Sequence, residues 1–66
     1  MEDGAQLRIV LNRLMEENRY SLDEYDRRID GARKSGNGGA AERMEEAKQS
    51  IERGNEALRA ALKLIK

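Results

Sequence analysis

The sequence predicts an all-α protein, a helical hairpin that assembles into a larger helical bundle. Two long segments carry apolar residues spaced by threes and fours, the pattern of helices with one buried face. Between them lies a single run of helix-breaking residues, from Ser35 to Gly39. No segment alternates polar and apolar residues as a strand does. With 66 residues the chain has room for one domain, which we expect to span 1–66.

The composition predicts that this domain folds with little stability to spare. Thirteen basic residues balance thirteen acidic ones, and 39% of the chain is charged against 38% hydrophobic. Leu, Ile and Val are scarce, but disorder also requires a high net charge, and here the net charge is zero. A chain of this size buries only about 60% of its unfolded surface, so its core is marginal. A partner chain is therefore an expected supplement.

The first segment contains a stripe that stays in phase over about 30 residues because it repeats with an eleven-residue offset. Taken alone, this stripe predicts one long helix. Its members are Leu7, Leu11, Leu14, Asn18, Leu22, Tyr25, Ile29 and Ala32.

A competing signal lies in the middle of that stripe. Ser21 and Glu24 have the spacing of a capping box, and Tyr20 and Tyr25 stand at its staple positions. Asn18 suits the left-handed residue that ends a helix. These features favour a break, which gives helices at about 5–17 and 22–34. One continuous helix stays open as the alternative.

The second segment predicts a helix over about 40–65 that follows a hairpin loop at 35–39. Large and small residues alternate along its seam, which lets a neighbouring backbone approach closely. Gly54 is the most informative member, because a mid-helix glycine costs about 1 kcal/mol relative to alanine and therefore suggests a close contact. The seam consists of Met44, Ala47, Ile51, Gly54, Leu58, Ala61 and Ile65.

The residue types that are missing exclude most enzyme chemistry. The chain has no His and no Cys, so it lacks the usual nucleophile pairs and the usual ligands of zinc and haem. Asp23, Asp26 and Asp30 form a carboxylate ridge at i, i+3 and i+7, but without the spacing of a calcium loop. We interpret the ridge as a solvated face of ion pairs. The sequence therefore predicts no catalytic residue, no cofactor and no metal site. The cations placed to neutralise the ridge are Arg27, Arg33 and Lys34.

The charge pattern also argues against nucleic acid and membrane as partners. The net charge is zero and no aromatic residues are interleaved with the basic ones, so nucleic acid is not expected. The longest run of large apolar residues is Ile9–Leu11, far short of a membrane span. The start Met1-Glu2-Asp3 lacks the basic and apolar regions of a secretory signal. We expect a cytoplasmic protein.

Residues 10–33 contain the stretch Leu14-x-x-x-Asn18-x-Tyr20-Ser21-x-x-Glu24-Tyr25. This stretch resembles the short C-terminal domain family, known as SHOCT, and its actinobacterial relatives. The family has Gly where this chain has Asn18, and an aliphatic residue where it has Tyr20. The resemblance implies a small helix–turn–helix hairpin used for association, with no catalytic residues to carry over.

Two weaker resemblances involve the rest of the chain. The hairpin length and loop position are similar to those of small co-chaperones of type III secretion needle subunits, which implies a protein partner. The second resemblance is to phage hairpin proteins that sequester cyclic nucleotides, and it implies a small anionic ligand held between protomers. It rests on Glu46-Ala47-Lys48, Ile51-Glu52-x-Gly54 and Ala57-Leu58.

The end of the hairpin away from the loop has more apolar residues than one helix pair can cover. We therefore expect a non-enzymatic interaction or oligomerisation module, which binds itself as a homodimer or larger assembly, or another helical protein. A ligand sponge and a secretion co-chaperone are the alternatives. The predicted interface comprises Leu7, Ile9, Val10, Leu11, Leu14, Met15, Gly54, Leu58, Ala61, Leu62, Leu64 and Ile65.

Overall fold

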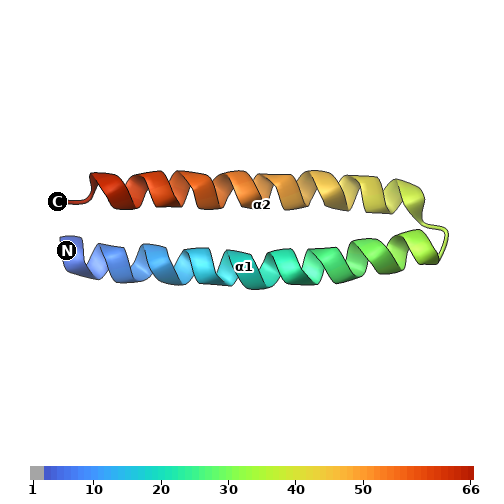
Figure 1. Ribbon diagram of the computed structural model, residues 1–66, viewed down its shortest axis with the longest axis horizontal. Coiled ribbons are helices and arrows are strands. Elements are labelled where there is room, and N and C mark those ends of the chain that lie inside the picture. The colour runs from blue at the N-terminus through green and yellow to red at the C-terminus, as the bar shows by residue number, and fades with distance from the viewer. Residues whose placement is uncertain (1–2) are drawn as a thin grey trace.

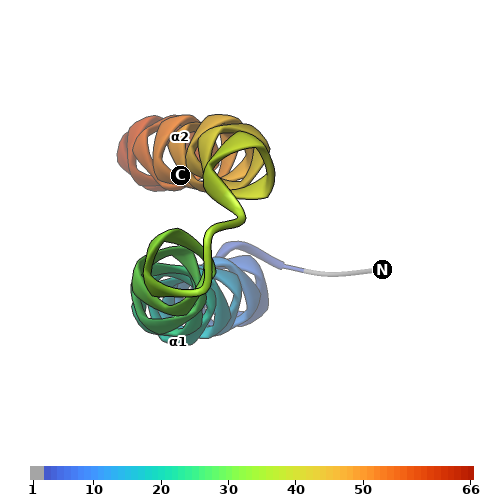
Figure 2. The same ribbon diagram turned by 90° about the vertical axis from the view of Figure 1, so that its right-hand side faces the viewer.

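Two long antiparallel helices make up the protein. The computed structural model describes residues 3–66. Met1 and Glu2, which belong to the segment expected to lack a secretory signal, lie outside the described residues. Helix α1 spans Gly4–Lys34 and helix α2 spans Gly38–Leu64. They form a rod of 49 × 16 × 15 Å with both termini at one end, which we call the open end (Figures 1 and 2). The predicted all-α helical hairpin is confirmed.

Helix α1 is continuous, so the preferred break at Asn18–Tyr20 is wrong and the single-helix alternative holds. The carboxylate of Glu24, expected to cap a helix start, accepts hydrogen bonds from the Arg27 and Arg28 side chains instead. The true N-cap is Asp3. All eight residues of the predicted α1 stripe are at least half-buried. Packing along that stripe outweighs a cap, which is worth only about 1 kcal/mol.

The turn between the helices is shorter than predicted. It occupies residues 35–37, and both Gly38 and Gly39 belong to the first turn of α2. Gly36 has φ of 82°, the left-handed conformation that glycine adopts without steric cost. The Asn37 N–H donates to the Ala32 carbonyl at 2.8 Å, and the Gly36 N–H donates to the Arg33 carbonyl at 3.2 Å. This is a Schellman motif, and it ends α1 without help from the following glycines.

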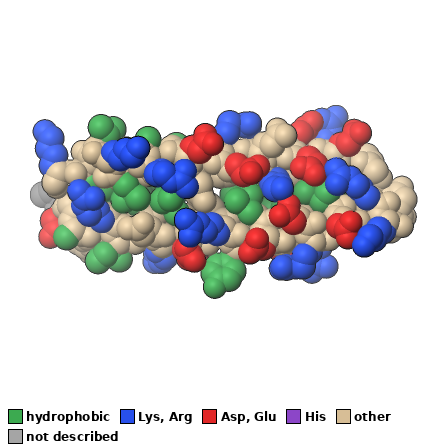
Figure 3. Space-filling view, viewed as in Figure 1, with side chains coloured by type: hydrophobic (Ala, Val, Ile, Leu, Met, Phe, Trp, Pro, Cys, Tyr) green, Lys and Arg blue, Asp and Glu red, His purple; other side chains and the backbone are tan. Residues whose placement is uncertain are grey.

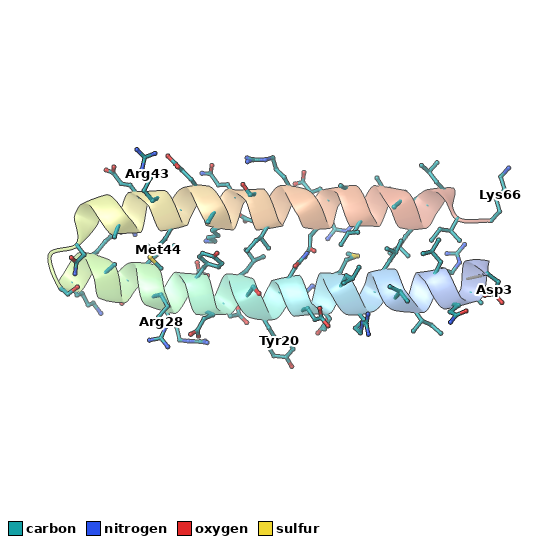
Figure 4. All side chains as sticks on the ribbon, turned by 180° about the vertical axis from the view of Figure 1, so that it is seen from behind. Asp3, Tyr20, Arg28, Arg43, Met44 and Lys66 are labelled. Atoms are coloured by element: carbon teal, nitrogen blue, oxygen red, sulfur yellow. The ribbon has the colours of Figure 1, made fainter. Side chains whose placement is uncertain are left out.

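One row of α2 residues faces α1, and none of its members is exposed. The predicted seam was therefore partly wrong: its large members belong to this row, but Ala47, Gly54 and Ala61 lie at its edge. Figure 4 shows Met44 between the helices, whereas Arg43 points away from α1 and Tyr20 away from α2. We call these residues the facing row: Ala41, Met44, Lys48, Ile51, Asn55, Leu58, Leu62 and Ile65.

The core is a thin line between the helices. Only three apolar residues of the described chain are buried: Ala41, Ile29 and Met15, with 0%, 2% and 7% of their surface exposed. Two helices in contact cover only one side of each other, so the other apolar residues keep part of their surface in water. Within residues 3–66, neither helix is long and apolar enough to cross a membrane.

Candidate interaction surface

A pair of asparagines, one half-buried and one buried, joins the helices near the middle of the rod. The Asn18 side-chain amide donates to the Asn55 side-chain oxygen at 2.7 Å. The Asn55 amide in turn donates to the Met15 backbone carbonyl at 3.3 Å. Asn55 is only 7% exposed, and every buried side-chain polar atom among the described residues has a partner. A polar pair of this kind fixes the register of two helices, because sliding them by one turn would leave both amides unsatisfied.

From this pair to the turn, the contacts between the helices are partly ionic. Lys48 of α2 contacts Asp26 of α1 at 2.6 Å, and Arg33 of α1 contacts Glu45 of α2 at 3.1 Å. The Asp26 carboxylate raises the pKa of Lys48 through their hydrogen bond, so the lysine keeps its charge. Its side chain is 24% exposed, which makes it the most covered charge in these pairs. Figure 3 shows acidic and basic side chains along the line between the helices on one face.

Two of the three carboxylates of the predicted ridge, Asp26 and Asp30, are paired with cations, and Lys34 is the one expected cation among those partners. Asp30 contacts Lys34 at 2.8 Å, and this carboxylate raises the pKa of the lysine. Asp26, however, is neutralised by Lys48 from the other helix. The two nearby arginines, Arg27 and Arg28, are engaged by Glu24, and their hydrogen bonds lower the pKa of that carboxyl. Within residues 3–66 the structure shows no cluster of metal-ligating residues.

From the asparagine pair to the open end, the contact is mainly apolar. One polar contact closes this end: the Arg8 guanidinium donates to the Ile65 backbone carbonyl at 2.9 Å. Gly4 lies so close to the Lys66 carbonyl that a Cβ at this position would collide with it. The start of α1 and the end of α2 are therefore held against each other, and they present their apolar side chains together.

Most of the predicted interface residues keep part of their surface in water. Met15 is buried inside the hairpin and is not accessible to a partner. Ile9 and Leu64 are exposed to 69% and 79%. Ile9 is two positions from both Leu7 and Leu11, about 200° around the helix, so it lies on the opposite side of α1 from the stripe that packs on α2. The half-buried members are Leu7, Val10, Leu11, Leu14, Gly54, Leu58, Ala61, Leu62 and Ile65.

The close contact predicted at Gly54 is not made with α1. A Cβ added to Gly54 would meet no atom within 4 Å. The buried position next to it belongs to Asn55, which sequence reasoning overlooked because a polar residue does not mark a core. A signal was present: Asn18 and Asn55 lie 18.5 residues on either side of the midpoint between Gly36 and Asn37. Residues equally far from a tight turn lie opposite each other in a hairpin.

Comparison of the chain with protein-family models, curated proteins and solved structures finds no match. The resemblances to the short C-terminal domain family, to secretion co-chaperones and to cyclic-nucleotide sponges therefore stay predictions from the sequence. Any statement about function has to come from the surface of the hairpin.

Proposed function

We propose that this chain is a small, non-enzymatic protein–protein interaction module that associates through its open end. The observation that carries the proposal is the exposure of Ile9 and Leu64, 69% and 79%, beside a group of half-buried aliphatic side chains. In a chain where Leu, Ile and Val are scarce, these residues gather at one end instead of in a central core. Contiguous apolar surface of this kind marks a site of association.

The energetics favour a partner at this end. Full removal of a Leu or Ile side chain from water contributes about 1.5–3 kcal/mol. The hairpin gains only part of this energy for Leu7, Leu11, Leu58 and Leu62, because each stays half-buried. Several further kcal/mol would become available if another helix covered the same side chains, and a marginal domain gains most from such an addition.

The partner that suits this surface is another helical chain, either a second copy or a different protein. A pair of long helices presents its apolar side chains along a rod, and helices pack along such a rod by inserting side chains between those of their neighbours. A cytoplasmic location, expected from the sequence, is part of this proposal.

Three single substitutions test the proposal, since three large apolar side chains within residues 3–66 are mostly exposed. We expect Ile9→Lys or Leu64→Lys to weaken association at least tenfold and to leave helix content unchanged, because neither side chain is buried in the hairpin. Tyr20→Lys is the matched control: Tyr20 is 73% exposed but lies in the middle of α1. Sedimentation equilibrium over a wide concentration range measures association, and circular dichroism measures helix content.

Two results would contradict the proposal. One is a wild-type chain that sediments as a monomer at every concentration and that associates with no other helical protein. The other is an associating chain for which Ile9→Lys and Leu64→Lys have no more effect than Tyr20→Lys.

A further inference from the structure

Helix α2 carries two different surfaces on either side of its facing row. Successive residues of an α-helix are turned by about 100°, so the residues just after and just before each facing residue form two further rows. The row just after is charged at every position except Gln49; it comprises Glu42, Glu45, Gln49, Glu52, Glu56, Arg59, Lys63 and Lys66. The row just before has a single charge, Arg43. We call it the second face of α2; it comprises Ala40, Arg43, Ala47, Ser50, Gly54, Ala57, Ala61 and Leu64.

The second face has no polar role inside the hairpin. Among the described residues, no hydrogen bond or ion pair joins it to α1, whereas Glu45 of the charged row pairs with Arg33. Arg43, its one charged member, pairs with Glu46 of its own helix. Leu64, its one large apolar member, is 79% exposed. The face therefore makes no polar contact with α1. Ala47, Gly54 and Ala61 are half-buried at the edge of the facing row, and the other five members are exposed.

Gly54 lies in the middle of the second face, and nothing within the chain explains it. A mid-helix glycine weakens a helix relative to alanine. The space around Gly54 is open within 4 Å, so contact with α1 does not require a glycine here. With the small residues Ser50 and Ala57 on either side of it in this row, the glycine leaves room for another backbone to come close, as in tightly packed helix pairs.

The hairpin exposes more surface than a compact monomer of its mass, and the excess is about the area that one partner of a dimer buries. The chain exposes 5069 Å². A compact monomer of 7.5 kDa would expose about 4,200 Å². The excess of about 800 Å² equals the area that one partner contributes to a protein–protein interface of standard size.

We propose that a second copy of this chain docks on the second face, with the two α2 helices antiparallel. The proposal rests on the proposed function and names the partner for its α2 side, which carries Leu64. An effect of Ile9→Lys on association without an effect of Leu64→Lys would place the contact on α1 and overturn this proposal. In a two-fold contact the same surface meets itself, so a charged face would repel its copy, whereas this face has one charge in eight positions. A second copy is therefore a partner that this surface can contact without bringing like charges together.

The charges along α2 favour one direction through their long-range field, since most of them lie on the charged row and not on the second face. Residues 38–52 contain four glutamates against Arg43 and Lys48, which gives a net charge of −2. Residues 53–66 contain Glu56 against four basic residues (Arg53, Arg59, Lys63 and Lys66), which gives +3. Antiparallel helices place each acidic half beside a basic half and also oppose their macrodipoles. Parallel helices would bring the two basic halves together.

Size and charge also decide the register. When Gly54 lies opposite Ala57 of the second copy, Leu64 lies over Ala47 and fills the space that this small residue leaves. Arg43 then falls beyond the overlap and keeps its contact with water. If the two α2 helices instead overlapped along their whole length, Arg43 of one copy would lie against Ala61 of the other. This contact would remove the Arg43 charge from water without giving it a partner.

Cysteine cross-linking tests this arrangement, and the chain contains no cysteine of its own. Ala57→Cys lies next to the two-fold axis, so two copies are expected to form a disulfide under mild oxidation. The two copies of residue 47 lie about 25 Å apart along the axis, so Ala47→Cys alone should not cross-link. A mixture of the Ala47→Cys and Leu64→Cys variants should form a disulfide between the two variants. Glu52→Cys, on the charged row, is the control that should stay uncrosslinked.

The outcomes separate this proposal from the proposed function. Efficient cross-linking of Ala47→Cys alone would show parallel helices and overturn it. A dimer in sedimentation that does not cross-link at residue 57, or that cross-links at residue 52, would also overturn it. The proposed function would then still hold, with association through another surface. A chain that is monomeric at all concentrations would overturn it as well; the proposed function would fail too if no other helical protein bound.

A matched pair of glycine variants gives an independent measurement. Gly54→Leu is expected to raise the dissociation constant of the dimer at least tenfold, because a large side chain would separate the two α2 helices. Gly31→Leu is the control, since Gly31 is also helical and also has no atom within 4 Å of an added Cβ. Equal dissociation constants for wild type and Gly54→Leu would exclude a close approach at Gly54.

Discussion

The pair Asn18–Asn55 gives the sharpest prediction about stability. Asn55→Ala removes two hydrogen bonds between the helices, to Asn18 at 2.7 Å and to the Met15 carbonyl at 3.3 Å. Each is worth a net 0.5–1.5 kcal/mol, so together they contribute about 1–3 kcal/mol. Alanine returns about 0.5 kcal/mol through its higher helix propensity. We therefore expect the free energy of unfolding to fall by about 0.5–2.5 kcal/mol.

The assay is urea unfolding followed by circular dichroism, at several fixed protein concentrations because association adds to the apparent stability. Asn12→Ala is the matched control: Asn12 is exposed, and its amide donates to the Arg8 carbonyl of the same helix at 3.0 Å. Its effect should stay within about 0.5 kcal/mol. If Asn55→Ala unfolds at the same urea concentration as wild type, or if both variants lose equal stability, the pair does not join the helices.

The double variant Asn18→Leu with Asn55→Leu separates stability from register. Replacing both partners of a hydrogen bond with apolar groups of similar shape is neutral or stabilising. We therefore expect a chain that is at least as stable as wild type. Without the polar pair, however, helices can slide or assemble in other numbers, so its sedimentation should show a mixture of species. One well-defined species would show that other contacts set the register.

Two further predictions concern the local structure of the helices. Ser21→Ala should raise the free energy of unfolding by up to about 0.5 kcal/mol in thermal unfolding, because Ser21 is inside a continuous helix; a loss of about 1 kcal/mol would show that it is an N-cap. Gly36→Ala should lower stability by about 1–2 kcal/mol, because φ at Gly36 is 82°. Gly39→Ala should raise stability by about 0.4–1 kcal/mol, because Gly39 lies in the first turn of α2. Equal effects of the two glycine variants would contradict the turn geometry.

The two halves of the hairpin differ in their contacts: the half near the turn has ion pairs between the helices, and the open end has exposed apolar side chains. Near the turn, the contacts Asp26–Lys48 and Arg33–Glu45 hold the helices together through charges that are partly exposed. Such pairs contribute little stability each but set which side of one helix faces the other. The aliphatic side chains lie at the opposite end, where they can meet another chain. This division explains how a chain with so few large apolar residues keeps some of them at its surface.

Much of the fold could be predicted from the sequence because it depends on local chemistry. The α1 stripe from Leu7 to Ala32 keeps its phase for 26 positions, and all eight of its residues are covered in the structure. The turn was predicted to within two residues at its second end. The difference arises because Gly38 and Gly39 were expected to be loop residues, whereas both lie in the first turn of α2. The α2 facing row was harder: Lys48 and Asn55 are polar and yet are covered, because each has a partner on α1.

The sequence by itself determined two helical segments, the turn between them and the residues of α1 that pack against α2. These features follow from periodicity and from the conformations that glycine and asparagine permit, which are properties of a short stretch of chain. Only the tertiary structure decided that α1 runs unbroken past Ser21, because that depends on packing against α2 outweighing a local cap. Only the tertiary structure showed that Asn55 rather than Gly54 faces α1, because the Asn18 amide on the other helix selects that side of α2. That rotation leaves most of the second face of α2 exposed, and this is the surface on which we propose that a second copy docks.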